Sequence, residues 1–246
     1  MKEILGIDVG ATGIKGALVD IKKGVLITER IKYPTPAEAT PQSMTEVIKK
    51  LVKDHNWEGK PIGMGFPSVI KNGIALSASN IDESWIDFPI TGFLNKKLKS
   101  PVTVINDADA AGIAEVKFGC GKDMRGLVIL LTLGTGIGSA MIMDGKLLPN
   151  TELGRIYYKD SVAEKYASNK AREKKELSYK NWGKELNKVL NHIEFILSPD
   201  HFIIGGGISK KFDKFKEYLN TDASIEPAQL RNNAGIIGAA YAAVPH

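Results

Sequence analysis

One pattern occurs twice in this chain: an apolar, β-prone run, a turn rich in glycine and threonine, and a second apolar run. The first copy spans 4–20 and turns at 10–13, and the second spans 127–143 and turns at 134–139. Glycine allows tight turns and keeps Cβ atoms away from a ligand, so successive backbone N–H groups in such a turn can cradle a phosphate. Either copy alone fits an ordinary β-hairpin equally well. Two copies predict a duplicated α/β fold with two phosphate-binding lobes and a cleft between them.

These turns, with a third glycine run, supply the candidate phosphate ligands. Asp8 cannot contact phosphate without repulsion, so we expect it to act through a hydrated Mg²⁺, which binds few carboxylates and keeps its waters. The third run, the glycine triplet 205–207, is by itself weak evidence for a phosphate site. The candidate donor-binding residues are Asp8, Gly10, Thr12, Gly13, Lys15, Thr132, Gly134, Thr135, Gly136, Gly205, Gly206 and Gly207.

Asn106 and Asp107 stand where an apolar run, 102–105, gives way to small residues at helical spacing. A carboxylate at the carboxyl end of a strand lies where α/β proteins bind ligands. The same carboxylate suits a helix N-cap, because it can accept from the first N–H groups, and taken alone this is the stronger interpretation. The two phosphate turns reverse that preference and make Asp107 the candidate general base. Capping is compatible with this role, since a helix start would aim the carboxylate.

The closing segment, 232–243, is a second helix without bulky side chains, like the one after Asp107. Two such helices can cross closely and act as a hinge, and closure of a hinge excludes water from phosphoryl transfer. We therefore expect an N-terminal lobe of residues 1–106, with helix 233–246 packed back on it, and a C-terminal lobe of residues 107–232.

Hydrophobic spacing and turn residues predict the remaining elements. They are a strand over 25–33, a helix over 43–53 capped by Thr40 or Ser43, a strand running into a turn at 62–67, a hairpin at Asp144–Gly145, a helix over 184–197, and a strand from 202 that leads through the glycine triplet into a Lys-rich helix. Trp85 is expected to anchor its loop.

The charge and the cysteine content of the chain limit the kinds of molecule that it is expected to bind. The chain has 33 Lys and Arg against 28 Asp and Glu, a formal net charge of +5, which permits a phosphate substrate, a polyanion or nucleic acid. No basic arm rich in aromatic residues or recognition helix is visible, so we expect no nucleic-acid partner. Cys120 is the only cysteine, which excludes an intrachain disulfide and a cysteine-cluster metal site. No apolar run approaches the roughly 20 residues of a membrane span, and we expect a cytoplasmic protein without a membrane partner.

The stretch 159–184 is strongly charged, with basic residues in excess of acidic ones. Such a run is commonly a solvated helix face. Together with Lys210, Lys211, Lys214 and Lys216 it would also form a track for a polyanion outside the cleft, which ATP does not need.

Two polar side chains suit a sugar. Asn80 offers both donors and an acceptor, which fits vicinal hydroxyls, although an asparagine in a turn is the simpler interpretation. Glu152 lies on a short, tight segment and by itself is equally a surface acid near a turn.

With these pieces in place, the chain resembles the ROK family of sugar kinases (repressor, open reading frame, kinase), which has the actin-like ATPase/hexokinase-type (ribonuclease H-like) fold. The segments that carry the resemblance are 8–13, 106–109, 133–138, 152–154, 204–207 and the closing Ala/Gly helix. The likeness is closest to the polyphosphate glucokinase branch, through 80–85, 106–112, 182–183, 198–200 and 205–211.

The resemblance implies a transfer of phosphoryl from polyphosphate or ATP, with Mg²⁺, to the 6-hydroxyl of glucose or a related hexose. Asp107 would be the general base. The implied sugar-binding residues are Asn80, Asn106, Asp107, Glu152 and Arg155. The family's cysteine-rich zinc motif is missing, so no zinc is expected. A homodimer is expected, since the family is often dimeric.

Two positions depart from the family pattern. Arg155 stands where the family carries histidine, and Tyr157 where it carries a sugar-contacting acid. Arginine is always protonated and only donates, so an ATP-dependent kinase for a different hexose, or a catalytically weak sugar-binding relative, stays open. A non-catalytic sugar sensor is disfavoured, because relatives that repress transcription carry a DNA-binding segment before the first phosphate motif, and here only Met1–Glu3 precede the strand.

Overall fold

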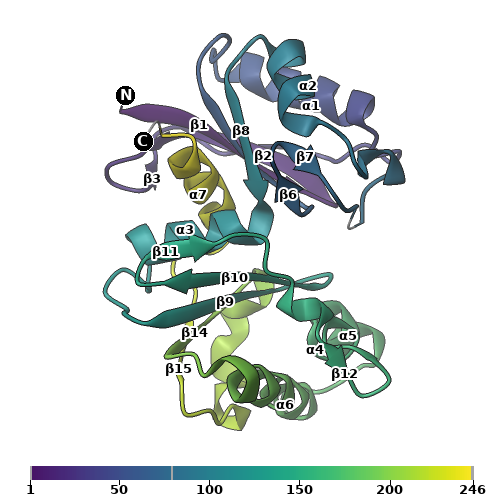
Figure 1. Cartoon of the computed structure of the whole chain (residues 1–246), viewed down its shortest axis with the longest axis vertical. Coiled ribbons are helices and arrows are strands. Elements are labelled where there is room, and N and C mark those ends of the chain that lie inside the picture. Colours follow the sequence, from purple (N-terminus) through teal and green to yellow (C-terminus); the bar gives the residue numbers. More distant parts are fainter. Residues whose placement is uncertain (1, 79, 245–246) are drawn as a thin grey trace. The chain divides into compact units, whose positions relative to one another are not determined.

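The structure is a computed structural model that describes residues 2–78 and 80–244 (Figure 1). The chain forms two compact units: unit 1 comprises Met1–Ala114 and Asn233–His246, and unit 2 comprises Glu115–Asn232. The boundary falls within helix α3 (Asp107–Phe118) rather than before it. The reason is packing, because a Cβ atom added to Gly238 would lie only 1.7 Å from the carbonyl oxygen of Ala110. The first turns of α3 are thereby held inside unit 1.

The sheet of unit 1 has the order β3-β2-β1-β5-β8, with β4 also paired to β2. β1 and β2 are antiparallel, whereas β1, β5 and β8 are parallel. The bounds are β1 Glu3–Gly10, β2 Gly13–Asp20, β3 Val25–Leu26, β4 Ile31–Tyr33, β5 Ile62–Phe66 and β8 Val102–Asn106, with a separate small hairpin of β6 Ile70–Lys71 and β7 Ile74–Ala75. The prediction of a single strand over 25–33 is wrong, because β3 and β4 are separate strands. Between them, the Thr28 hydroxyl accepts the Leu18 N–H (3.0 Å), where a continuous strand would offer a backbone carbonyl.

The sheet of unit 2 repeats this plan in the order β11-β10-β9-β14-β15. An antiparallel hairpin, β9–β10, is followed by the parallel strands β14 and β15. The bounds are β9 Leu127–Leu133, β10 Ile137–Met143, β11 Lys146–Leu148, β14 His201–Gly205 and β15 Ser224–Pro227, with a small hairpin of β12 Tyr157–Tyr158 and β13 Ser161–Val162. Asp144 and Gly145 join β10 to β11 with φ of 49° and 75°, the backbone that a tight hairpin requires. The duplicated fold predicted from the sequence is confirmed.

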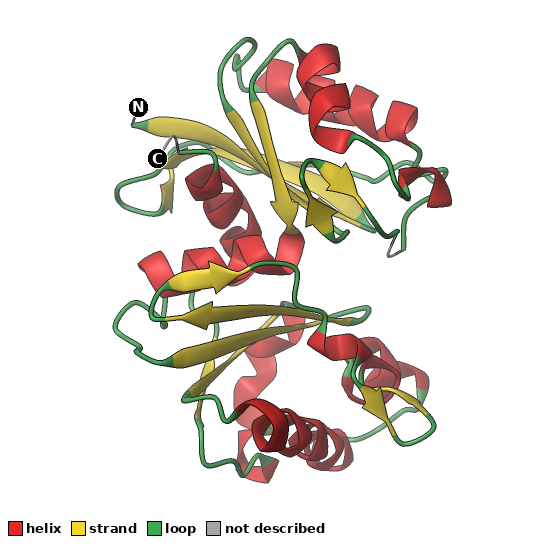
Figure 2. Ribbon diagram, viewed as in Figure 1, coloured by secondary structure: helices red, strands yellow, loops and turns green. Residues whose placement is uncertain are grey.

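The helices cover these sheets (Figure 2). Their bounds are α1 Pro41–Asp54, α2 Ile90–Leu98, α3 Asp107–Phe118, α4 Glu164–Ala167, α5 Asn169–Lys174, α6 Tyr179–Leu197 and α7 Ala234–Ala242, with 3₁₀ turns η1 Glu83–Trp85, η2 Leu153–Arg155, η3 Gly207–Lys214, η4 Lys216–Tyr218 and η5 Arg231–Asn233. Of the two predicted caps, Thr40 and Ser43, Thr40 is the N-cap of α1, and it forms a capping box with Ser43, so the helix begins before the predicted residue 43. Helix α6 begins earlier than predicted, because Ser178 caps it by accepting from the Asn181 N–H. The Lys-rich helix predicted after the glycine triplet is the 3₁₀ helix η3, which begins at Gly207 within the triplet and has no side-chain cap.

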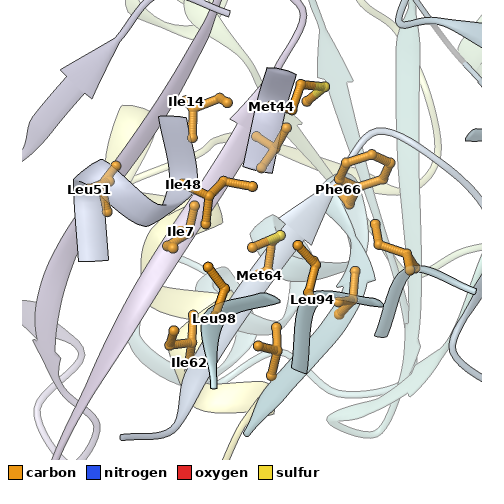
Figure 3. Packing of buried hydrophobic residues seen from close by; sticks show 14 of the residues in the cluster. Ile7, Ile14, Met44, Ile48, Leu51, Ile62, Met64, Phe66, Leu94 and Leu98 are labelled. Carbon is orange, nitrogen blue, oxygen red and sulfur yellow. The ribbon is translucent and has the colours of Figure 1, made fainter. Parts of the chain in front are cut away.

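The core of unit 1 lies between the sheet and helices α1 and α2. Figure 3 shows Ile48 and Leu51 of α1, Ile7 of β1, Met64 of β5 and Leu94 of α2 packed together. Their close packing excludes water from one face of the sheet, where burial of apolar surface drives folding.

Trp85 completes this core as the loop anchor that the sequence predicts. Its ring is fully buried and lies 4.6 Å from the Phe66 ring, and its Nε1 donates to the Ala39 carbonyl (2.8 Å).

Helix α7 packs against β1 and β5. A Cβ atom on Gly6 would lie 2.0 Å from the Ile236 carbonyl oxygen, and one on Gly63 would lie 1.8 Å from the Ala239 carbonyl oxygen. Glycine at both strand positions is therefore required for the backbone of this helix to lie directly on the sheet.

The core of unit 2 is built on α6 and the neighbouring sheet. Trp182 packs edge-on against Phe215 at 4.8 Å and donates from Nε1 to the Ala167 carbonyl (3.0 Å). Over the described residues, none of the helices combines the length and the apolar character needed to cross a membrane.

Candidate active site

Helix α3 begins directly after β8, and Asn106 caps it. The Asn106 Oδ1 accepts from the N–H groups of Ala108 (2.8 Å) and Asp109 (3.0 Å), and its Nδ2 donates to the Ser68 carbonyl (3.1 Å). The side chain is buried, at 6% exposed. The sequence assigns the capping option to Asp107, whereas the structure gives it chiefly to Asn106, because Asn106 is the residue that precedes the first helical N–H groups.

Asp107 lies at the first position of α3 and is half-buried. Its Oδ1 also accepts the Ala108 N–H (2.8 Å). A negative charge at a helix N-terminus is stabilised by the helix dipole. The carboxylate is thus held in one direction at the carboxyl end of β8, the position at which parallel sheets bind ligands.

The first hairpin places a carboxylate beside a cation. Asp8 and Lys15 are direct partners across β1 and β2, and the Lys15 Nζ lies 2.7 Å from the Asp8 Oδ2. A Cβ atom on Gly235, at the start of α7, would lie 2.7 Å from the same carboxylate oxygen. The Asp8 side chain is 15% exposed.

Asp8 fits a hydrated Mg²⁺ when a phosphorylated donor supplies further ligands. Mg²⁺ is held in such sites by one or two carboxylates, substrate phosphates and water. Within residues 2–78 and 80–244, no group of three or more His, Cys, Asp or Glu residues could hold a metal ion without such help.

Lys32 is a second cation at the first turn, and the sequence does not single it out. A Cβ atom on Gly13 would lie 2.4 Å from the Lys32 Cε, so the lysine stem lies over the turn. Its place follows from the β2–β4 register, which pairs Lys15 with Lys32. The Thr35 hydroxyl donates to the Gly10 carbonyl (2.6 Å) and closes the turn.

The second turn has a carboxylate beside it instead. The Glu164 Oε2 accepts the Ile137 N–H (3.3 Å), and a Cβ atom on Gly136 would lie 2.4 Å from that oxygen. The Lys170 N–H, in the first turn of α5, donates to the Gly134 carbonyl (3.0 Å). Each turn joins two antiparallel strands, but Lys32 lies beside the first and Glu164 beside the second. Glu164 lies in the basic stretch 159–184, and nothing in the sequence pattern indicates that it contacts the second turn.

Glu152 precedes η2 and is ion-paired to Arg155, whose Nε lies 3.1 Å from the Glu152 Oε2. Burial raises the pKa of Glu152, Arg155 lowers it, and the nearby charge of Glu164 raises it. Two carboxylates therefore share one neighbourhood, with Arg155 compensating their repulsion. Tyr157 is 72% exposed.

The glycine triplet lies beside the end of β9, because β9 and β14 are parallel and their carboxyl ends meet at one edge. Gly206 has φ of 81°, and a Cβ atom there would lie 2.7 Å from the Leu133 carbonyl oxygen. Glycine is required on both counts. Thr132, Gly134 and Gly205 are thus brought to one edge of the unit 2 sheet.

The predicted site residues fall into two groups. Unit 1 holds Asp8, Gly10, Thr12, Gly13, Lys15, Asn80, Asn106 and Asp107, and unit 2 holds Thr132, Gly134, Thr135, Gly136, Glu152, Arg155, Gly205, Gly206 and Gly207. Asn80 is exposed with φ of 60°, a left-handed conformation that asparagine tolerates.

Paired sheets of this topology, with glycine turns and a carboxylate at the start of the helix after a parallel strand, define the actin-like, hexokinase-type fold of sugar kinases. The chain belongs to the ROK family, whose model matches residues 4–164. This is the family that the sequence motifs predict.

Particular relatives are similar over nearly the whole chain. A polyphosphate glucokinase of Mycobacterium tuberculosis is 46% identical over 240 residues, which are 97% of this chain and 90% of that protein. The crystal structure of an inorganic polyphosphate/ATP-glucomannokinase from Arthrobacter sp. strain KM superposes with a TM-score of 0.94 at 47% identity, covering 98% of this chain and 97% of that one. A ROK family glucokinase from Streptomyces griseus, solved with glucose and AMPPNP, shares the fold alone, at 24% identity and a TM-score of 0.83 over 98% of this chain and 99% of that one.

Proposed function

We propose that this protein is a sugar kinase that transfers a phosphoryl group from inorganic polyphosphate, and also from ATP, to the 6-hydroxyl of glucose, giving glucose 6-phosphate. The observation that carries the proposal is the half-buried Asp107 carboxylate, which is aimed by the capped start of α3. Full-length similarity to polyphosphate glucokinases supports the choice of substrates.

In this reaction Asp107 takes the proton of the 6-hydroxyl as that oxygen bonds to the terminal phosphorus. The bond from that phosphorus to the bridging oxygen breaks, and the donor leaves one phosphate shorter. A positioned base contributes about 10²–10⁴-fold, and the remaining catalysis is alignment and charge neutralisation. Asn106 serves mainly to position Asp107, since its amide already makes three hydrogen bonds to backbone groups.

The donor phosphates would lie against the first turn, where Lys15 and Lys32 supply positive charge. Asp8 would hold Mg²⁺ through water. When bound, Mg²⁺ neutralises negative charge on the donor phosphates. In unit 2, the backbone N–H groups of the second turn and of the glycine triplet are further candidate phosphate ligands.

Glu152 and Glu164 of unit 2 would contact the sugar, and Asn80 of unit 1 is a further candidate sugar contact. Carboxylates accept hydrogen bonds from vicinal hydroxyls, and Glu164 provides an acid near Glu152 although Tyr157 replaces the expected one. Arg155 holds Glu152 in place and does not have to substitute for histidine as an acceptor.

The arrangement of basic residues in unit 2 supports polyphosphate, rather than ATP, as the main donor. The Arg172 guanidinium lies 4.8 Å from the centre of the Tyr179 ring, and the Lys214 Nζ lies 5.3 Å from it. The two basic segments noted in the sequence, 159–184 and 210–216, therefore meet at Tyr179. Basic residues of two segments that meet at one place suit a long polyanion.

A donor-by-sugar activity panel tests the proposal. Polyphosphate and ATP are each combined with glucose, mannose and other hexoses, for wild type and Asp107→Asn. Glucose phosphorylation by polyphosphate that the variant loses supports the proposal. Activity with ATP alone on another hexose would favour the alternative that the Arg155 replacement raises, and sugar binding by calorimetry without turnover on any donor would favour a sensor.

We also propose that the protein is a cytoplasmic homodimer, as the family resemblance leads us to expect. Sedimentation equilibrium of the purified chain measures the oligomeric state, and a monomer at working concentration would contradict the dimer.

A further inference from the structure

Glu115 is a buried charge that the proposed reaction does not use. It is the first residue of unit 2, and its side chain is 0% exposed. Removing a carboxylate from water is strongly unfavourable unless hydrogen bonds compensate for the lost hydration. The partners of this carboxylate therefore indicate what it stabilises.

Its partners come from two separate segments. The Glu115 Oε1 accepts the Leu230 N–H (2.8 Å), and its Oε2 accepts the N–H groups of Gln229 (3.1 Å) and Cys120 (3.2 Å). The Cys120 thiol also donates to Oε2 (3.4 Å). Gly119 makes room for the carboxylate, since a Cβ atom there would lie 1.9 Å from Oε2. Charge-assisted bonds of this kind are stronger than neutral ones.

These partners lie at the two places where the chain passes between the units. One passage is Ala114–Glu115 and the other is Asn232–Asn233. Gln229 and Leu230 come shortly before the second passage. A single carboxylate thus ties both passages together on the unit 2 side.

Each passage lies within or next to a helix whose first turn is at a candidate site residue. Helix α3, which contains Glu115, begins at Asp107. Helix α7 follows the second passage, and its Gly235 lies against the Asp8 carboxylate. The two helices cross in direct contact at Ala110 and Gly238.

We propose that Glu115 is a positioning residue for phosphoryl transfer. It holds the end of α3 and the approach to α7 in one arrangement, so that Asp107 and Asp8 keep their mutual placement within unit 1. The inference rests on the proposed function, because it concerns the aim of the same base.

Glu115→Gln tests this with little change of shape. Glutamine has one acceptor oxygen where glutamate has two, so the N–H groups of Leu230 and of Gln229 can no longer both be satisfied. We expect kcat to fall about 10- to 100-fold, since small misplacement of reacting groups costs this much, with little change in KM. Hydrogen exchange at Gln229 and Leu230 should become faster.

Glu194→Gln is the matched control. Glu194 of α6 likewise accepts two backbone N–H groups, from Ala223 (2.8 Å) and Asp222 (3.2 Å), but lies at neither passage. Its replacement should accelerate local exchange and lower Tm while leaving kcat unchanged. A charge-retaining variant, Glu115→Asp, should lower kcat in the same direction and serves where the glutamine variant does not fold.

Two outcomes would overturn the inference, and they are distinguishable. Normal kcat in an active, folded Glu115→Gln protein would make Glu115 a structural residue only, while leaving the proposed function intact. Wild-type protein without kinase activity on any donor would overturn the proposed function, and the positioning role with it.

Discussion

Arg155 and Glu152 form an ion pair in which the arginine Nε lies 3.1 Å from the carboxylate Oε2. A guanidinium cannot accept a hydrogen bond from a sugar hydroxyl. Arg155 therefore cannot replace, as an acceptor, the histidine of the family pattern. It instead offsets the charge of Glu152, whose pKa is raised by burial and by the nearby charge of Glu164. The arginine at position 155 therefore determines how the Glu152 carboxylate is held.

This relationship predicts a pH effect. Burial and the charge of Glu164 raise the pKa of Glu152. Since the folded state then holds the proton more tightly than the unfolded state, the resulting stabilisation is present at low pH and is lost as pH rises through the raised pKa. If sugar binding needs the ionised carboxylate, kcat/KM should rise over the same interval.

Two variants should shift the pKa of Glu152, and with it the pH profile of kcat/KM, in opposite directions. Arg155→Gln should move the acid limb of the kcat/KM profile to higher pH, and Glu164→Gln should move it lower, as read from initial rates across pH. Acid limbs that coincide with wild type in both variants would exclude Glu152 as the titrating group.

Replacement of the proposed base should remove catalysis without removing sugar binding. For Asp107→Asn we expect kcat to fall by about 10²–10⁴-fold, with the glucose Kd, measured by calorimetry, nearly unchanged. Asp87→Asn is the control, because Asp87 is an exposed acid of unit 1 with φ of 56°, which asparagine also tolerates. Near-normal kcat in Asp107→Asn would show that another group takes the proton.

Loss of the α3 cap should affect both stability and rate. Asn106→Ala removes the side-chain acceptor of the Asp109 N–H and the donor to the Ser68 carbonyl, and it leaves the Ala108 N–H with the Asp107 carboxylate. We therefore expect a loss of about 1–3 kcal/mol in the free energy of unfolding, measured with urea. It should also lower kcat, because Asp107 loses its support. Thr40→Ala removes the comparable cap of α1 and should lower stability without changing kcat. Equal kcat values in the two variants would argue against a positioning role for Asn106.

The basic surface at Tyr179 should affect one donor only. Arg172→Gln with Lys214→Gln should raise the KM for long polyphosphate and make it less dependent on salt, because each replaced cation leaves one phosphate unneutralised and lowers the logarithmic salt slope by about one unit. The KM for ATP should stay constant. Lys50→Gln is the matched control, because Lys50 likewise lies over a tyrosine ring, 4.4 Å from the centre of the Tyr33 ring, but in unit 1. A salt response shared by both donors would remove the basis for a polyphosphate track.

Cys120 should be unreactive in the native protein. Burial, with the charge of Glu115, raises the pKa of its thiol to about 12, so the thiolate is scarce at neutral pH. Labelling with a thiol reagent should be slow in native wild type and faster in Glu115→Gln, which lacks the nearby charge. Rapid labelling of the native wild type would contradict the buried arrangement around Glu115.

The sequence by itself determined most of the local elements and the repetition of the hairpin. The two hairpins, the capping box of α1 at Thr40 and the Asp144–Gly145 turn depend on neighbours within a few residues, and their spacing encodes them directly. The family motifs around Asp107 followed from the same local order.

Only the tertiary structure decided which side chains meet. Lys32 reaches Gly13 through the β2–β4 register, and Glu164 reaches the second turn from a different segment. Glu115 meets Gln229 through the fold of unit 2. Short-range spacing carries no information about such pairs, because register and packing between distant segments set them. That is also why Asn106 rather than Asp107 proved to be the main cap, since the direction of each side chain depends on how β8 enters α3.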